Sequence, residues 1–185
     1  MKLFLFFSGI LLMTLSCQKE LNFENFTIDT NLPDNDTILL LSKYPELKLY
    51  NSEIVKSKSR TAHIVQAASY SDGFRKGIFL FDDYKCKAIT QADTLNIKLN
   101  NYNGYFGNGI LIKVFNNQFY IKDIDPKTLK GEEKFKKVRV LSQKLILNSN
   151  KFNKNDSIYG FIDYKCSIDS LVYKRFRGYF KTIIL

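Results

Sequence analysis

The sequence predicts an all-β fold: a single antiparallel β-sandwich or barrel-like domain of roughly eight to ten strands. Two observations favour this class. Short apolar runs alternate with turn signals along most of the chain, and few windows hold helical spacing. The aromatic residues are 16 Phe and 11 Tyr with no Trp, which is a strand-favouring set. At 185 residues and 45% hydrophobic composition, the chain is long enough for one packed core and short for two.

The clearest local element is a hairpin within residues 109–123. Asn116 and Asn117 can both adopt the positive φ that a two-residue turn needs. A turn closed there gives one apolar and one polar face, which fixes the register. The expected pairs are Phe115 with Gln118, Val114 with Phe119, and Ile112 with Ile121.

Further strands are expected at 60–69, 77–88, 94–99, 138–147, 157–168 and 170–185, with a short helical turn near 44–47. In 138–147 the apolar phase changes between Val140 and Leu141, which predicts a bulge or bend near Ser142. The last strand should be two-sided. Its apolar side holds Val172, Phe176, Phe180 and Ile184, and its basic side holds Arg175, Arg177 and Lys181.

One short internal repeat stands out: DYKC occurs at 83–86 and again at 163–166. In both copies Tyr and Cys would share one strand face, so two related strands in similar environments are expected. The chain has three cysteines, and the first, Cys17, belongs to the N-terminal segment that is discussed next. If Cys17 is lipidated, Cys86 and Cys166 either form a disulfide or remain as two buried thiols. The repeat favours the disulfide.

The first seventeen residues, MKLFLFFSGILLMTLSC, have the layout of a secretion signal. Lys2 supplies the positive charge, and the apolar core that follows is too short to span a bilayer of roughly 30 Å. Residues 12–17 resemble the signal of a Gram-negative bacterial lipoprotein, although the aliphatic Leu15 stands one position late. The resemblance implies cleavage before Cys17, an acyl chain such as palmitate on that thiol, and retention at the outer membrane. The alternative is an ordinary signal peptide that carries a cysteine.

The expected organisation is a signal peptide at 1–16, a lipidated cysteine with a flexible tether at 17–36, and the β domain at 37–185. The tether assignment depends on the Asn, Asp, Thr and Pro content of 21–36, which shows no sustained period.

Catalytic and metal chemistry find little support. The single histidine, His63, lies on an expected strand, and any catalytic triad would have to use it as the base. Zinc would need more Cys or His ligands than the spacing supplies. Hard oxygens for calcium occur between Asp29 and Asp36, but without the EF-hand pattern, and a solvated tether is the favoured interpretation. No cofactor and no metal site are expected. Carboxylates considered for glycosidase chemistry are Asp82, Asp83, Asp163 and Asp169.

The formal net charge of +10 at pH 7 favours an acidic partner, and the export signal argues against nucleic acid. Two candidate contact surfaces follow. The basic one is Arg175, Arg177 and Lys181, with Lys134, Lys136, Lys137 and Arg139 nearby. The aromatic one is the Asn/Gly-rich segment with Tyr102, Tyr105 and Phe106. The leading interpretation is a lipid-anchored, non-catalytic binding module that contacts the membrane and an acidic envelope component or protein. The alternatives are an immunity- or inhibitor-type lipoprotein that blocks a toxin or hydrolase, and an envelope hydrolase with an Asp/Tyr site.

Overall fold

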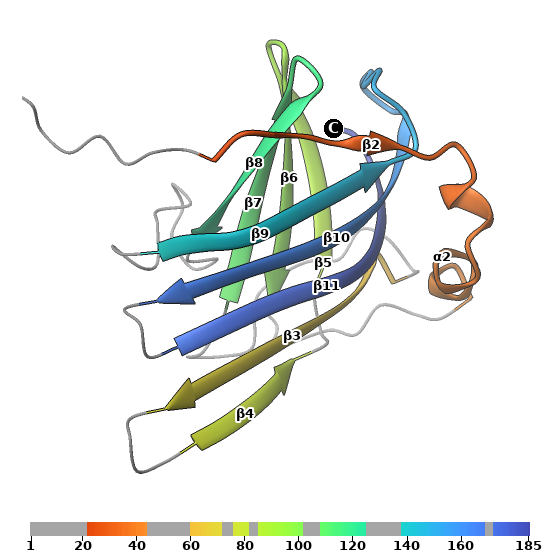
Figure 1. Ribbon diagram of the computed structural model, residues 1–185. Helices are drawn as coiled ribbons and strands as arrows, with labels where there is room; N and C mark the ends of the chain where they lie inside the picture. The colour runs from red at the N-terminus through yellow and green to blue at the C-terminus, as the bar shows by residue number, and fades with distance from the viewer. Residues whose placement is uncertain are drawn as a thin grey trace, which may run out of the picture.

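The structure is a computed structural model that describes residues 22–43, 60–71, 76–81, 85–101, 108–124, 138–168 and 172–185. These residues form two β-sheets, one lying in front of the other, with their strands crossing obliquely (Figure 1). The expected all-β sandwich is therefore confirmed.

The rear sheet in Figure 1 has five strands in the order β1-β8-β7-β6-β5, all antiparallel. Their bounds are β1 Glu24–Asn25, β5 Lys85–Gln91, β6 Thr94–Asn101, β7 Asn108–Phe115 and β8 Gln118–Ile124.

The front sheet has six strands in the order β2-β9-β10-β11-β3-β4, and only the short β2–β9 pair is parallel. Their bounds are β2 Thr27–Ile28, β3 Ala62–Ser71, β4 Lys76–Phe81, β9 Val138–Leu147, β10 Ser157–Ile168 and β11 Val172–Ile183.

The β7–β8 hairpin has the predicted register, with Phe115 opposite Gln118 and Val114 opposite Phe119. Its two turn residues, Asn116 and Asn117, have φ of 47° and 61°. Short polar side chains tolerate this left-handed region, so the turn chemistry alone was enough to set the register.

The predicted irregularity in β9 is also confirmed. Lys165 of β10 lies opposite Ser142, whereas the next residue, Cys166, lies opposite Val140. Leu141 is therefore the extra residue of a β-bulge, and it points to solvent. The bulge moves Val138 and Val140 onto the core side of the sheet.

The expectation of one strand over 77–88 is wrong. The segment contains β4 at the edge of the front sheet and the start of β5 at the edge of the rear sheet. Ile78 and Leu80 are 74% and 69% exposed, whereas Cys86 and Ala88 are buried. All four residues have the same parity, so an alternating pattern continues across the crossover and conceals it.

Residues 22–36 were expected to belong to a tether, but the structure places them on the domain. β1 pairs with Gln118–Phe119, and β2 pairs with Ile146–Leu147. Phe26, between them, belongs to the core. A 3-10 helix, η1 (Leu32–Asp34), and a short helix, α2 (Asp36–Leu41), follow, and Leu32 and Ile38 are buried there. Two buried residues, Phe26 and Leu32, stand among many exposed polar ones, so the segment has the composition of a linker, which explains the error.

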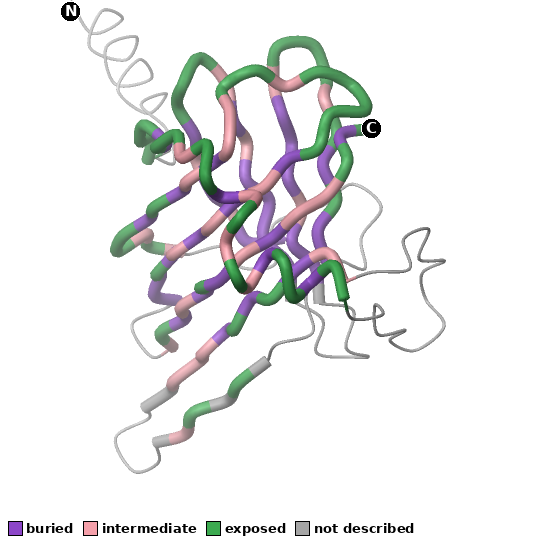
Figure 2. The backbone as a smooth tube through the Cα atoms, turned by 90° about the vertical axis from the view of Figure 1, so that its right-hand side faces the viewer, coloured by how far each residue is buried: buried purple, intermediate pink, exposed green. Residues whose placement is uncertain are grey.

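Backbone segments, which we call joints, connect the two sheets at one end of the sandwich, one segment on each side. On one side the chain passes from β1 in the rear sheet to β2 in the front sheet. On the other, Ile184 bridges Ala88, and the Leu185 backbone N donates to the Ala88 carbonyl at 3.0 Å. The buried residues of the hydrophobic core lie on strands of both sheets (Figure 2). The helical turn expected near 44–47 lies outside the described residues.

Candidate functional site

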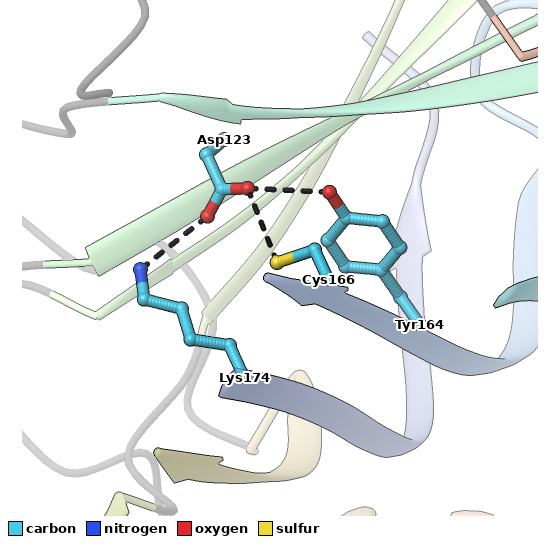
Figure 3. Close-up of polar contacts among 4 residues, drawn as sticks. All are labelled: Asp123, Tyr164, Cys166 and Lys174. Carbon is cyan, nitrogen blue, oxygen red and sulfur yellow. Dashed lines mark hydrogen bonds and ion pairs between the residues drawn. The ribbon is translucent and has the colours of Figure 1, made fainter. Parts of the chain in front are cut away.

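A polar cluster lies inside the sandwich at the end opposite the two joints (Figure 3). The Asp123 carboxylate, from β8, faces three side chains of the other sheet. Its Oδ2 accepts hydrogen bonds from the Tyr164 hydroxyl at 3.2 Å and the Cys166 thiol at 3.7 Å. Its Oδ1 lies 3.5 Å from the Lys174 ammonium. The cluster is thus a charged link between the sheets.

The protonation states of this cluster follow from its burial. Tyr164 and Cys166 are 0% exposed. Burial first, and then the Asp123 charge, raises the pKa of the Tyr164 phenol and raises the pKa of the Cys166 thiol to about 12. Both groups are therefore protonated donors at neutral pH, and neither is a nucleophile. The arrangement is suited to holding the sheets together.

Sequence reasoning missed this cluster, although a signal for it exists. Asp123 continues the phase of Phe119 and Ile121, which form the core face of β8. Lys174 has the phase of Phe176 and Phe180 on β11. A charged residue in phase with a buried face indicates an internal partner, but it does not identify the partner.

The predicted disulfide is wrong, because Cys86 and Cys166 are two buried thiols that are not joined to each other. Cys86 lies at the start of β5 in the rear sheet, whereas Cys166 lies on β10 and turns its thiol toward Asp123. The two DYKC copies also differ in environment, since Lys85 is buried and Lys165 is exposed.

The second candidate is the outer face of the front sheet, which faces the viewer in Figure 1. The strand registers place its side chains in rows across β9, β10 and β11. One row is Lys144–Asp163–Arg177, and the next is Ser142–Lys165–Arg175. We call this surface the basic face; its charged residues are Arg139, Lys144, Asp163, Lys165, Arg175, Arg177 and Lys181.

Asp163 organises the centre of the basic face. Arg175 donates to both of its oxygens, Nε to Oδ1 at 2.9 Å and Nη2 to Oδ2 at 2.6 Å. Arg177 Nε lies 3.9 Å from Oδ2, and its guanidinium stands 5.9 Å from the Phe161 ring centroid. The hydrogen bond from Arg175, helped by the nearby positive charges, lowers the pKa of Asp163. This carboxyl is consequently ionised and is not suited to donate a proton.

Lys181 departs from the expected basic row. Its ammonium donates to the Ser42 hydroxyl just beyond α2, and burial lowers the pKa of this lysine. The two arginines therefore share one cluster, and Lys181 ties the helical segment to β11 instead.

A cavity of about 360 Å³ opens next to Arg177, whose guanidinium stands over the lining residue Phe161. Its floor is Ile146, Phe161 and Tyr179 of the front sheet, and the two rings lie 4.9 Å apart. Its wall comes from the segment around η1: Asp29, Asn31, Leu32, Asp34 and Asn35. Most of these wall residues are the oxygen ligands considered for calcium. Among the described residues, no group of three or more His, Cys, Asp or Glu side chains could hold a metal ion.

Of the remaining sequence candidates, His63 is the one that lies within the described residues. His63 is exposed on β3 and pairs across the sheet with Tyr179. Outside the described residues lie Cys17, Asp82, Asp83, Tyr102, Tyr105, Phe106, Lys134, Lys136, Lys137 and Asp169.

Comparison of the chain with protein-family models, with curated proteins and with solved structures finds no match. A search of the described residues for a helix of sufficient length and hydropathy to cross a bilayer also finds none. The fold thus defines the class, an all-β sandwich, and function must be argued from the surfaces just described.

Proposed function

We propose that the protein is a lipid-anchored envelope protein whose β-sandwich acts as a non-catalytic binding module for an acidic partner. The observation that carries this proposal is the charge of the basic face. Against the carboxylate of Asp163, that face presents Arg139, Lys144, Lys165, Arg175 and Arg177.

The geometry of this face favours recognition of an anion. Arg177 is 58% exposed at its side chain and is held in place by Asp163 and the Phe161 ring. An arginine fixed by a ring and a carboxylate loses little freedom when it binds an anionic group. Exposed Leu141 on the same face adds apolar contact area.

Within the part of the chain that the structure describes, two candidate acid–base centres argue against the hydrolase alternative. The Asp123 cluster is enclosed in the core, and its tyrosine and cysteine stay protonated at neutral pH. Asp163 is held ionised by its arginines. A hydrolase needs a proton donor or nucleophile that a substrate can reach.

Binding is tested with paired charge reversals. The double variant Arg177→Glu, Lys165→Glu should reduce binding to immobilised anionic polymers at least tenfold. The control, Lys151→Glu with Lys154→Glu, makes the same net change at exposed positions outside the sheets and should cause a small loss. Equal losses in both doubles would show that only net charge matters and would overturn the proposal.

Anchoring is tested separately at Cys17. Mass spectrometry should find a mature chain that begins at an acylated Cys17 and enters the detergent phase on phase separation. The Cys17→Ser variant should stay in the aqueous phase. An unmodified cysteine in the wild-type chain would refute the lipid anchor while leaving the binding proposal untouched.

A further inference from the structure

We infer that the partner of the basic face is an acidic polysaccharide, with one sugar ring seated in the cavity beside Phe161 and Tyr179. This inference rests on the proposed binding function and names its ligand class.

The cavity has the chemistry that a sugar ring requires. Its volume of about 360 Å³ lies at the lower end of the range of small-ligand sites, roughly 300–1,000 Å³. Phe161 and Tyr179 present aromatic surface from the floor, against which the apolar C–H face of a pyranose can pack. Asp29, Asn31 and Asp34 line the opposite side with carboxylate and amide groups, which match the donors and acceptors of sugar hydroxyls.

The wall of the cavity is built in advance. The Asp29 backbone N donates to the Leu147 carbonyl at 2.9 Å, and the Asp29 carboxylate accepts from the Asn31 backbone N at 2.9 Å. Leu32 is buried beneath the wall, and Asn35 caps α2 by accepting from the Thr37 backbone N at 3.0 Å. Because these contacts are made within the protein itself, little ordering is needed on binding.

The charges around the cavity set the orientation of the ligand. Asp29 and Asp34 line the wall, and the Arg177 guanidinium stands over Phe161, a floor residue. The carboxylates would repel an anion on their side and favour hydroxyls, whereas Arg177 would pair with the acidic group of the sugar.

The positive side chains of the basic face continue from the cavity along the front sheet. Lys165 is four residues beyond Phe161 on β10, which corresponds to about 13 Å along the strand. Arg175 lies directly across from Lys165, and Lys144 lies between them and the cavity wall, opposite Asp163. A chain molecule with repeated negative groups fits this arrangement better than a single small anion. A flat anionic bilayer would use the cations but leave the cavity without a role.

Binding of polygalacturonate oligomers, measured by calorimetry, tests the inference. Polyglutamate, neutral dextran and anionic phosphatidylglycerol vesicles serve as comparison probes. The wild-type protein should bind polygalacturonate most tightly and dextran least. Tyr179→Ala and Asn31→Ala should each weaken polygalacturonate binding at least tenfold and leave polyglutamate binding unchanged.

A control variant separates the effect of the cavity from the effect of the charge. Tyr173→Ala makes the same aromatic truncation on the same strand but away from the cavity, and it should change polygalacturonate binding less than twofold. Asn31 is exposed and outside the core, so its variant keeps the test valid if Tyr179→Ala fails to fold.

The outcomes distinguish this inference from the proposed function. If Tyr179→Ala and Tyr173→Ala behave alike, or if polyglutamate or vesicles bind as tightly as polygalacturonate, the polysaccharide inference is overturned and the basic-face proposal survives. If the double reversal of Arg177 and Lys165 has no more effect than its matched control, the proposed function fails as well.

Discussion

Asp123 shows how a single residue organises the inside of this protein. One carboxylate oxygen accepts from the Tyr164 hydroxyl and the Cys166 thiol, and the other faces the Lys174 ammonium. An ion pair that is this deeply buried gains stability only if its remaining polar atoms are also bonded. Here the neutral phenol and thiol supply donors to the carboxylate, so the charge is enclosed without being isolated.

Removal of this carboxylate should be costly. Asp123→Leu would leave the buried Lys174 ammonium without its carboxylate and should lower the free energy of unfolding by about 3–5 kcal/mol. The double variant Asp123→Leu, Lys174→Met should recover most of the loss, because both charges then disappear together. Urea unfolding of the two variants at pH 7 measures this. A double variant as unstable as the single one would mean that the ion pair is not the cause.

At the scale of elements, β11 connects the whole architecture. It pairs with β10 over its full length, with β3 along its other edge, and reaches β5 through the Ile184 bridge. Gly178 allows β11 to pass this close to β3. Its φ is +154°, and a Cβ there would lie 1.9 Å from the His63 carbonyl oxygen of β3. Two residues along, Phe180 packs its ring over Gly160 of β10, where a Cβ would also collide.

We expect Gly178→Ala to destabilise the fold by at least about 2 kcal/mol, because the new methyl group would push β3 away and strain the backbone. The midpoint of urea unfolding should fall accordingly, and β3 amides should exchange hydrogen faster than those of the β7–β8 hairpin. A loss below about 1 kcal/mol would show that β3 and β11 can separate without cost.

For the whole molecule, closure depends on the two ends of the described chain. The 24–28 segment joins one side of the sandwich, and Ile184 with Leu185 joins the other. Both joints lie at the same end. The Asp123 cluster links the sheets at the opposite end through side chains.

The C-terminal joint is tested with adjacent isoleucines. Ile184 is 1% exposed and Ile183 is 55% exposed. Ile184→Ala should cost about 2–5 kcal/mol of unfolding free energy, as buried Ile→Ala changes do, whereas Ile183→Ala should stay within about 0.5 kcal/mol. Thermal and urea denaturation of both variants measure the difference. Similar values for the two would mean that the bridge to β5 contributes nothing to stability.

Local patterns were sufficient where the information is local. The Asn116-Asn117 turn fixed the β7–β8 register, and the phase change in β9 located the bulge beside Ser142. The basic side of β11 was predicted correctly for Arg175 and Arg177. Half of the candidate binding surface could thus be found from alternation alone.

The other half depended on residues that are distant in sequence. Asp163 organises the arginines from the neighbouring strand, and the cavity combines Asp29 and Asn31 with Phe161 and Tyr179. The sequence shows the oxygen-bearing side chains between Asp29 and Asp36, but only the fold brings Phe161 and Tyr179 next to them. No spacing rule links positions more than a hundred residues apart.

The sequence by itself determined the fold class, the hairpin register, the bulge and the two faces of the last strand, because a period of two reports which side of a strand is apolar. The tertiary structure decided that 77–88 crosses between sheets, that residues 24–28 belong to the domain, that Cys86 and Cys166 stay apart, and that Asp123 meets Lys174. The alternation of apolar and polar residues predicts which side of a strand each side chain lies on. Only the packing of the two sheets determines which residues that side chain contacts.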